Sequence, residues 1–236
     1  MKIIVTGGAG FIGSHLVERL LKDNHKVIVL DNLSNGNLNN IKHFKKKIVF
    51  KKCDLSKKGN WTNSFKDVDI IFHLAALADI VPSITNPDKY FQSNVTSTLN
   101  ILMAMKKYNI KKIIYSASSS CYGIPKKYPT LESSKVDPKY PYALTKWLAE
   151  EMIIHWSNIY NFEYISLRLF NVYGPRSRTS GTYGAVFGVF MAQKINKLPF
   201  TIVGDGSQTR DFTFVSDVVN AMIAALKTNY KNKIYN

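Results

Sequence analysis

Residues 2–16, KIIVTGGAGFIGSHL, decide the fold class of this chain. An apolar run of β-forming residues (3–5) leads directly into glycines at positions 7, 10 and 13. An amphipathic helix then begins, with leucines on one face and charged side chains on the other. A strand, a glycine turn and a helix in this order place backbone N–H groups and a helix N-terminus against a pyrophosphate. The stretch therefore predicts a dinucleotide-binding unit rather than a glycine-rich loop that binds nothing.

Each of the three glycines has its own task in such a unit. Gly7 permits the tight turn, Gly10 lets the backbone approach the phosphates, and Gly13 lets the helix pack close to the strand.

The composition limits the class of protein. With 236 residues the chain can bury a full core in one or two domains. It has no run of about 18 apolar residues that would span a bilayer, and it begins on a predicted strand rather than on a signal sequence. Two cysteines, Cys53 and Cys121, fit a reducing compartment. We therefore expect a cytoplasmic protein without a membrane segment. We expect no metal, since no Cys and His residues have metal-ligand spacing.

The net charge of +16 arises from 27 lysines and 5 arginines. Lysine runs such as 45–47 crowd the first third of the chain, which raises the alternative of nucleic-acid binding. Arginine, which binds phosphates through a planar fork, is scarce, and no aromatic platform interleaves with the lysines. We therefore expect a solvated lysine surface that helps to attract an anionic small substrate, and no nucleic-acid partner.

Predicted strands alternate with predicted helices through the first 171 residues. Apolar runs predict strands at 2–6, 26–31, 47–52, 69–74, 111–117 and 163–169, and helical periodicity predicts helices at 12–23, 87–108 and 141–160. Alternation of this kind predicts right-handed βαβ units and a parallel sheet. The turn-rich segment 32–40 follows the second strand, where loops face a nucleotide in an open α/β sheet. The expected fold is a Rossmann-type, doubly wound α/β domain over residues 1–171.

The pattern changes after residue 171. Gly174 and Pro175 interrupt the chain, and the following stretches predict a helix at 183–196, a strand at 200–203, a turn at 204–206, a strand at 211–215 and a helix at 216–228. The last residues, 233–236, resemble a strand with nothing after it. We expect residues 172–236 to form a smaller substrate-binding lobe that is incomplete at its C-terminus.

Two carboxylates follow predicted strands at the edge where a nucleotide would bind. Asp31 ends the second strand, where a carboxylate accepts hydrogen bonds from the adenosine ribose and repels a 2′-phosphate. No arginine follows it, so NAD is favoured over NADP. Asp54 ends the third strand and can meet the adenine edge. The alternative for both residues is an ordinary turn aspartate.

Reactive side chains follow the fifth strand and begin the next long helix. Tyr142 and Lys146 are four residues apart, so a helix places both on one face. The lysine charge stabilises a phenolate and lowers the pKa of the tyrosine toward a useful range. Residues 113–123 join a buried strand to a serine cluster, whose hydroxyls can donate and accept protons. A polar turn is the alternative interpretation of that cluster.

Taken together, these stretches resemble the extended short-chain dehydrogenase/reductase superfamily, in its NAD-dependent, UDP-glucose 4-epimerase-like branch of nucleotide-sugar epimerases and dehydratases. The resemblance covers nearly the whole chain and rests on ordered motifs at Thr6–Gly13, Asp31–Gly36, His73–Ala76, Ser118–Gly123, Tyr142–Lys146, Arg168–Asn171 and Arg210–Phe212. It implies an NAD-dependent enzyme that acts on a nucleotide sugar, and a homodimer formed through the two long helices.

The resemblance also assigns roles by position. The family's catalytic triad falls on Ser118, Tyr142 and Lys146: Tyr142 removes the proton of the sugar 4-hydroxyl, Ser118 hydrogen-bonds the same oxygen, and Lys146 binds the nicotinamide ribose. The substrate contacts fall on Ser118 and, for the diphosphate, on Asn171 and Arg210. The NAD contacts fall on Gly7, Gly10, Phe11, Ile12, Gly13, Asp31, Asn32, Ser34, Asn35, Gly36, Asp54, Leu55, Leu74, Ala75, Ala76, Asn94, Tyr142, Lys146 and Phe170. His73 matches a landmark, but we expect it only to pack at a strand end.

Reactions within this family differ in the fate of the 4-keto sugar. Its 4,6-dehydratases carry Asp-Glu directly after the catalytic Thr or Ser, and its decarboxylases keep a Glu two positions after it, whereas this chain has Ser119 and Ser120. A serine hydroxyl cannot replace a carboxylate in proton abstraction at C5. This favours a UDP-hexose or UDP-N-acetylhexosamine 4-epimerase that passes a hydride from C4 to NAD and back. The alternatives are a 4,6-dehydratase or UDP-glucuronate decarboxylase, and an inactive NAD-binding regulator, against which the intact triad argues.

Overall fold

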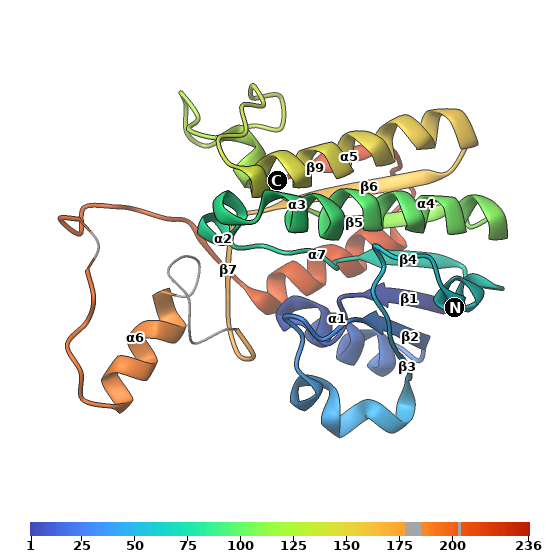
Figure 1. Ribbon diagram of the computed structural model, residues 1–236, viewed down its shortest axis with the longest axis horizontal. Coiled ribbons are helices and arrows are strands. Elements are labelled where there is room, and N and C mark those ends of the chain that lie inside the picture. Colours follow the sequence, from blue (N-terminus) through green and yellow to red (C-terminus); the bar gives the residue numbers. More distant parts are fainter. Residues whose placement is uncertain (178–185, 203) are drawn as a thin grey trace.

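The structure is a computed structural model that describes residues 1–177, 186–202 and 204–236. Its centre is a parallel sheet of seven strands in the order β3-β2-β1-β4-β5-β6-β9 (Figure 1). The strands are β1 (Lys2–Thr6), β2 (Lys26–Asp31), β3 (Val49–Lys52), β4 (Ile70–His73), β5 (Lys112–Ser118), β6 (Glu163–Leu169) and β9 (Lys233–Tyr235). Strand order runs outward in opposite directions from the β1–β4 pair, so this pair marks the point where open α/β sheets bind ligands. The predicted Rossmann-type fold is confirmed.

Helices cover both faces of the sheet. They are α1 (Phe11–Lys22) and α7 (Val215–Lys227) on one face, and α4 (Ser97–Tyr108) and α5 (Pro141–Tyr160) on the other (Figure 1). Alternate residues of β1 point to opposite faces. Ile3 therefore joins the core with α1 and α7, whereas Ile4 joins the core with α4 and α5. A strand that is buried on both faces explains the unbroken apolar run in the sequence.

Local sequence signals set the ends of the long helices. Pro141 occupies the first turn of α5, where its missing N–H costs no hydrogen bond. Asn109 and Asn161 end α4 and α5 in the left-handed conformation, with φ of 56° and 52°. Asparagine tolerates this conformation better than most residues, so both helices end where the sequence allows it.

All six strands predicted before residue 171 are present, but other segments differ from the prediction. The helix predicted at 87–108 consists of α3 (Pro87–Tyr90), a π-helical turn, η3 (Phe91–Thr96), and α4. The sequence did not predict the 3₁₀ helices η1 (Leu38–Lys47), η2 (Asn60–Phe65) and η4 (Ser119–Tyr122), the helix α2 (Ile80–Thr85) or the strand β7 (Asn171–Tyr173). All of these except η1 have six residues or fewer, and hydrophobic periodicity carries little information over so short a stretch.

The region after residue 171 divides into two parts. β7 pairs in parallel with β8 (Phe212–Phe214), near the predicted strand at 211–215, and α6 (Val186–Ile195) covers the described part of the helix predicted at 183–196. The prediction of a strand at 200–203 is wrong for its described residues, 200–202, and residue 203 lies outside them.

Residues 200–202 form no strand because they fold back on α6. The rings of Phe190 and Phe200 stack with their centroids 4.9 Å apart, and Thr201 N donates to Gln193 Oε1 at 3.2 Å.

The last helix and strand return to the main sheet. Val218 and Met222 of α7 are buried in the core beside α1, and β9 pairs in parallel with β6. These elements of the expected C-terminal lobe therefore pack as part of the Rossmann layer structure. Within the described residues, no helix is both long and apolar enough to cross a membrane.

The close packing at Gly13 leads to a first prediction. A Cβ on Gly13 would lie 2.2 Å from the Gly7 carbonyl oxygen, which is backbone and cannot move aside. The Gly13→Ala variant should therefore lower the free energy of unfolding by at least about 2 kcal/mol. Gly10→Ala is the matched control in the same turn, because its Cβ would meet Gly7 O at 3.1 Å. Urea unfolding of both variants measures the difference, and equal stability of the two would contradict the prediction.

Candidate active site

A cavity of about 1010 Å³ opens at the carboxyl ends of the central strands. It is lined by glycine-loop residues, by the ends of β2, β4 and β5, by the start of α5 and by residues near β7 and β8. All the predicted site residues but one line it: Gly7, Gly10, Phe11, Ile12, Gly13, Asp31, Asn32, Ser34, Asn35, Gly36, Asp54, Leu55, Leu74, Ala75, Ala76, Ser118, Tyr142, Lys146, Phe170, Asn171 and Arg210. The fold therefore brings together residues that are far apart in the sequence.

The exception is Asn94, which the resemblance placed in contact with NAD. Its side chain is 2% exposed and lies on the π-helical turn η3. The amide binds both backbone groups of Leu77, at 2.8 and 3.1 Å, and donates to Thr145 Oγ1 at 3.0 Å. Asn94 therefore fastens the segment after β4 to the helix α5, and its contact with NAD stays a prediction.

The glycine loop has the backbone geometry that its sequence predicts. Gly7 has φ of +69°, and a Cβ there would lie 2.8 Å from the backbone N of Ala75. Its N–H donates to Leu30 O at 2.8 Å, which joins the loop to β2. The first turn of α1 starts directly after this loop, so its free N–H groups face the cavity. The loop is a cradle for an anionic group.

Asp31 is held in place at the end of β2. Its Oδ2 accepts a hydrogen bond from Ala9 N at 2.9 Å, and its Oδ1 accepts one from Leu33 N at 2.8 Å. Burial raises the pKa of this carboxyl, and the two N–H donors oppose that rise. Each oxygen has a second lone pair free for a ligand hydroxyl. The residues present thus fit a dinucleotide whose ribose lies beside Asp31 and whose phosphates lie at the glycine loop.

Two serines surround the phenol of Tyr142. Ser118 Oγ is 2.7 Å from Ser120 Oγ, and both serines hydrogen-bond with Tyr142. Burial raises the pKa of Tyr142, whereas the bond with Ser118 and then the bond with Ser120 lower it. Sequence reasoning considered Ser120 only as a missing carboxylate and did not identify it as a partner of the phenol. The signal was present, since Ser120 lies two residues after Ser118 in a one-turn helix.

Lys146 lies one turn further along α5 and is 4% exposed. Its Nζ donates to Ser116 O at 2.5 Å and lies 4.2 Å from the centre of the Tyr115 ring. Burial lowers the pKa of Lys146 to about 7, and the charge of Glu150 opposes the change. Besides burial, the largest influences on the pKa of Tyr142 are Ser118, Asp79 and Ser120. The lowering of the tyrosine pKa by the lysine charge stays a prediction.

His73 does more than pack at a strand end. Thr98 Oγ1 donates to Asn94 O at 2.6 Å, so it must accept a hydrogen from His73 Nε2 at 2.9 Å. The bare Nδ1 of His73 then accepts from Thr6 Oγ1 at 2.8 Å. Thr6 Oγ1 in turn accepts from Leu74 N and Ala75 N, both at 3.1 Å. Neutral His73 with its proton on Nε2 therefore holds the ends of β1 and β4 together beneath the cavity.

Residues after β6 supply polar groups on the other side of the cavity. Asn171 Nδ2 donates to Asp211 O at 3.1 Å, and exposed Arg210 directs one guanidinium N–H to Thr209 O at 2.7 Å. Arg176, which the sequence analysis did not select, also lines the cavity and pairs with Glu18 at 2.7 Å. Its hydrogen bond lowers the pKa of Glu18 to about 2. The described residues contain no group of three His, Cys, Asp or Glu side chains that is placed to hold a metal.

Comparison with known proteins identifies the family of the chain. The model of the NAD dependent epimerase/dehydratase family matches residues 3–236. The chain belongs to this family. A protein of Methanocaldococcus jannaschii described as a putative UDP-glucose 4-epimerase is 42% identical over 236 residues, which cover 99% of this chain and 75% of that protein. This family member is an enzyme that uses NAD as its cofactor.

Two solved structures of the family are similar over the same span. A UDP-N-acetylglucosamine 4-epimerase from Methanobrevibacter ruminantium, bound to UDP-N-acetylmuramic acid, has a TM-score of 0.93 and 37% identity, covering 99% of this chain and 74% of that chain. A UDP-glucose 4-epimerase from Thermus thermophilus in complex with NAD has a TM-score of 0.90 and 33% identity, covering 100% and 76%.

The burial of neutral His73 leads to a prediction of pH dependence. Its pKa is lowered from 6.5 to about 3, chiefly by burial. Between these two pH values the unfolded chain binds a proton that the native state does not bind. The free energy of unfolding should therefore fall as the pH falls from about 6.5, by up to about 1.4 kcal/mol per pH unit from this residue.

Urea unfolding from about pH 7 to about pH 5 checks this slope. His73→Asn should flatten it, whereas His155→Gln, on the exposed side of α5, should leave it unchanged. A ¹⁵N spectrum that shows His73 protonated on Nδ1 would contradict the hydrogen-bond assignment.

Proposed function

We propose that this enzyme is a nucleotide-sugar 4-epimerase whose substrate is a UDP-hexose or UDP-N-acetylhexosamine. The observation that carries this proposal is the group of hydroxyls around Tyr142, formed by Ser118 and Ser120. These neutral groups suit removal and return of a hydroxyl proton, and they supply no base for the elimination of water. The epimerase descriptions of several relatives point in the same direction.

The chain's own residues perform proton transfer and orientation. Tyr142 accepts the proton of the sugar 4-hydroxyl and later returns it, and Ser118 hydrogen-bonds the same substrate oxygen. Lys146 holds the nicotinamide ribose, and its charge stabilises the phenolate during the transfer. NAD, when bound at the glycine loop and Asp31, supplies the acceptor and then the donor of the C4 hydride. The resulting 4-keto sugar must present its opposite face before the hydride returns.

For the sugar to turn in the site, the diphosphate end of the substrate must stay anchored. Arg210 and Asn171 line the same cavity beside the two-stranded β7–β8 sheet, apart from the seven-stranded sheet. An arginine suits a diphosphate because its planar fork donates two parallel hydrogen bonds. We propose that these two residues hold the diphosphate while the sugar turns, and that β7, β8 and α6 form part of the substrate lobe.

The nearest alternative is a dehydratase or decarboxylase. Asp79 lines the cavity, and its charge acts on Tyr142, so it is the carboxylate that would serve such a reaction. A dTDP-glucose 4,6-dehydratase from Streptomyces venezuelae also shares the fold, with a TM-score of 0.93 at 26% identity. Product analysis separates the two reactions, because epimerisation conserves mass and the alternatives release water or carbon dioxide.

We also propose a cytoplasmic homodimer without a nucleic-acid partner. The two cysteines, Cys53 and Cys121, are free, as suits a reducing compartment. Exposed apolar side chains of α4 and α5, Met103, Leu144 and Ile159, offer a contact surface for a second copy.

The proposal is tested by giving the enzyme a panel of nucleotide sugars and identifying the products by NMR and mass spectrometry. At least one UDP-sugar should give its 4-epimer with unchanged mass. Tyr142→Phe should lower kcat by about 10²-fold or more, because it removes the group that carries the proton. Tyr160→Phe, at the far end of the same helix, is the matched control and should keep full activity. A product lighter by water or carbon dioxide, or an active Tyr142→Phe enzyme, would refute the epimerase assignment.

A further inference from the structure

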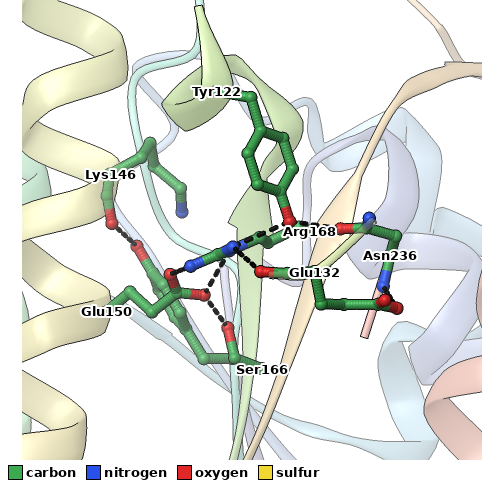
Figure 2. A network of polar contacts seen from close by, with 8 residues as sticks. Tyr122, Glu132, Lys146, Glu150, Ser166, Arg168 and Asn236 are labelled. Carbon is green, nitrogen blue, oxygen red and sulfur yellow. Dashed lines mark hydrogen bonds and ion pairs between the residues drawn. The ribbon is translucent and has the colours of Figure 1, made fainter. Parts of the chain in front are cut away.

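A buried ion pair lies behind the catalytic residues, one turn along α5 from Lys146 (Figure 2). Glu150 on α5 and Arg168 on β6 have side chains only 2% and 3% exposed, and Arg168 Nη2 lies 2.7 Å from Glu150 Oε2. Arg168 Nε also reaches both carboxylate oxygens, at 3.3 and 3.0 Å. Ser166 Oγ completes the site by donating to Glu150 Oε1 at 2.5 Å.

Stability alone is a weak reason for such a pair. Moving two charges out of water costs free energy that their attraction often fails to recover, and apolar residues of similar volume are often as stabilising. Every hydrogen-bonding group of a buried pair also has to find a partner. The remaining partners of Arg168 therefore indicate what the pair does.

Apart from a hydrogen bond from Nη1 to Glu132 O at 3.4 Å, Arg168 makes its other contacts with the serine turn. Its Nη1 donates to Tyr122 OH at 2.7 Å, and its guanidinium lies 4.9 Å from the centre of the Tyr122 ring. Tyr122 ends η4, the one-turn helix whose N-terminus is capped by Ser118 through a hydrogen bond from Ser120 N at 3.2 Å. The Tyr122 hydroxyl then donates to Asn236 Oδ1 at 2.7 Å. Tyr122 is thus fixed from two sides, and with it the C-terminal end of the turn.

The other half of the pair belongs to the helix that carries Tyr142 and Lys146. Glu150 lies one turn after Lys146, and its charge raises the pKa of Lys146 against the effect of burial. The pair therefore joins the two elements that must stay in register for proton transfer: the serine turn and the α5 helix.

We propose that Tyr122, held by the Glu150–Arg168 pair, is a positioning residue that keeps Ser118 and Ser120 aligned with the Tyr142 phenol. Tyr122 itself does not line the cavity, so its effect acts through the turn. The kinetic part of this inference rests on the proposed epimerase function, whereas the structural part does not.

The test compares two variants that each remove one hydroxyl from the same network. Tyr122→Phe keeps the ring and the ion pair but removes the bond from Arg168 to the turn. Ser166→Ala is the matched control, because Ser166 binds Glu150 and touches neither serine of the turn. Both variants are purified at full length and checked for native circular dichroism. Two quantities are then measured: kcat and KM with the UDP-sugar that the wild type converts, and the ¹³Cζ resonance of Tyr142, assigned with Tyr142→Phe.

Tyr122→Phe should lower kcat about tenfold with KM within about twofold, and it should shift the Tyr142 resonance, which reports hydrogen bonds to the phenol. Ser166→Ala should change neither, although it lowers the melting temperature. The proposal is overturned if the Tyr142 resonance does not move in Tyr122→Phe, or if both variants change it equally. If the wild type converts no UDP-sugar, the resonance alone decides: a shift confined to Tyr122→Phe upholds the positioning role while the epimerase proposal fails.

Discussion

The close approach of the ends of β1 and β4 is the constraint on which the rest of the site depends. The backbone of Gly7 lies so near that of Ala75 that a Cβ on Gly7 would come within 2.8 Å of Ala75 N. The Thr6 hydroxyl joins these strand ends by accepting from Leu74 N and Ala75 N while donating to neutral His73. This leaves the glycine loop and the segment after β4 side by side, both lining the cavity. A cofactor cradle follows because two parallel strands end together where the strand order divides.

Burial shifts the pKa values of the two reactive side chains on α5, Lys146 and Tyr142. A lysine with a pKa of about 7 is close to losing its charge at neutral pH, so its ionisation depends on its neighbours. Glu150 favours the charged form of Lys146, and Arg168 pairs with Glu150 within the protein interior. For Tyr142, two serine hydroxyls oppose the effect of burial on the pKa. The pKa of each reactive group therefore depends on its own set of neighbours.

The sequence correctly predicted those parts of the molecule in which a local pattern is compatible with only one kind of structure. The strand, glycine turn and helix of residues 2–16 gave the cofactor loop, and apolar runs gave the six strands before residue 171. The hydrogen bonds of Asn94 to Leu77 and Thr145 were not predicted, because they join segments that lie apart in the sequence. The strand prediction was wrong for residues 200–202 because a short apolar run does not reveal whether a strand partner exists.

Long-range hydrogen bonds could not be predicted, because a local sequence pattern does not reveal distant partners. The bond between Arg168 and Tyr122 joins residues far apart in the chain, and the proton position on His73 follows only from its two threonine partners. Side-chain identity shows what a residue can donate or accept, but the fold decides which partner it meets. A serine turn and a histidine landmark were therefore visible as residues, whereas their roles required the structure.

The choice between epimerisation and elimination depends on whether a base in this cavity can take the C5 proton of the 4-keto sugar. A ketone at C4 makes the neighbouring C5 proton acidic, so any base placed there would divert the reaction toward loss of water. At the two positions after Ser118, where dehydratases of this family carry carboxylates, this chain has serines, and one of them binds the phenol. Serine hydroxyls cannot accept the C5 proton near neutral pH. A serine that hydrogen-bonds Tyr142 thus occupies a position where a dehydratase carries a carboxylate, which supports the proposed epimerase over an elimination.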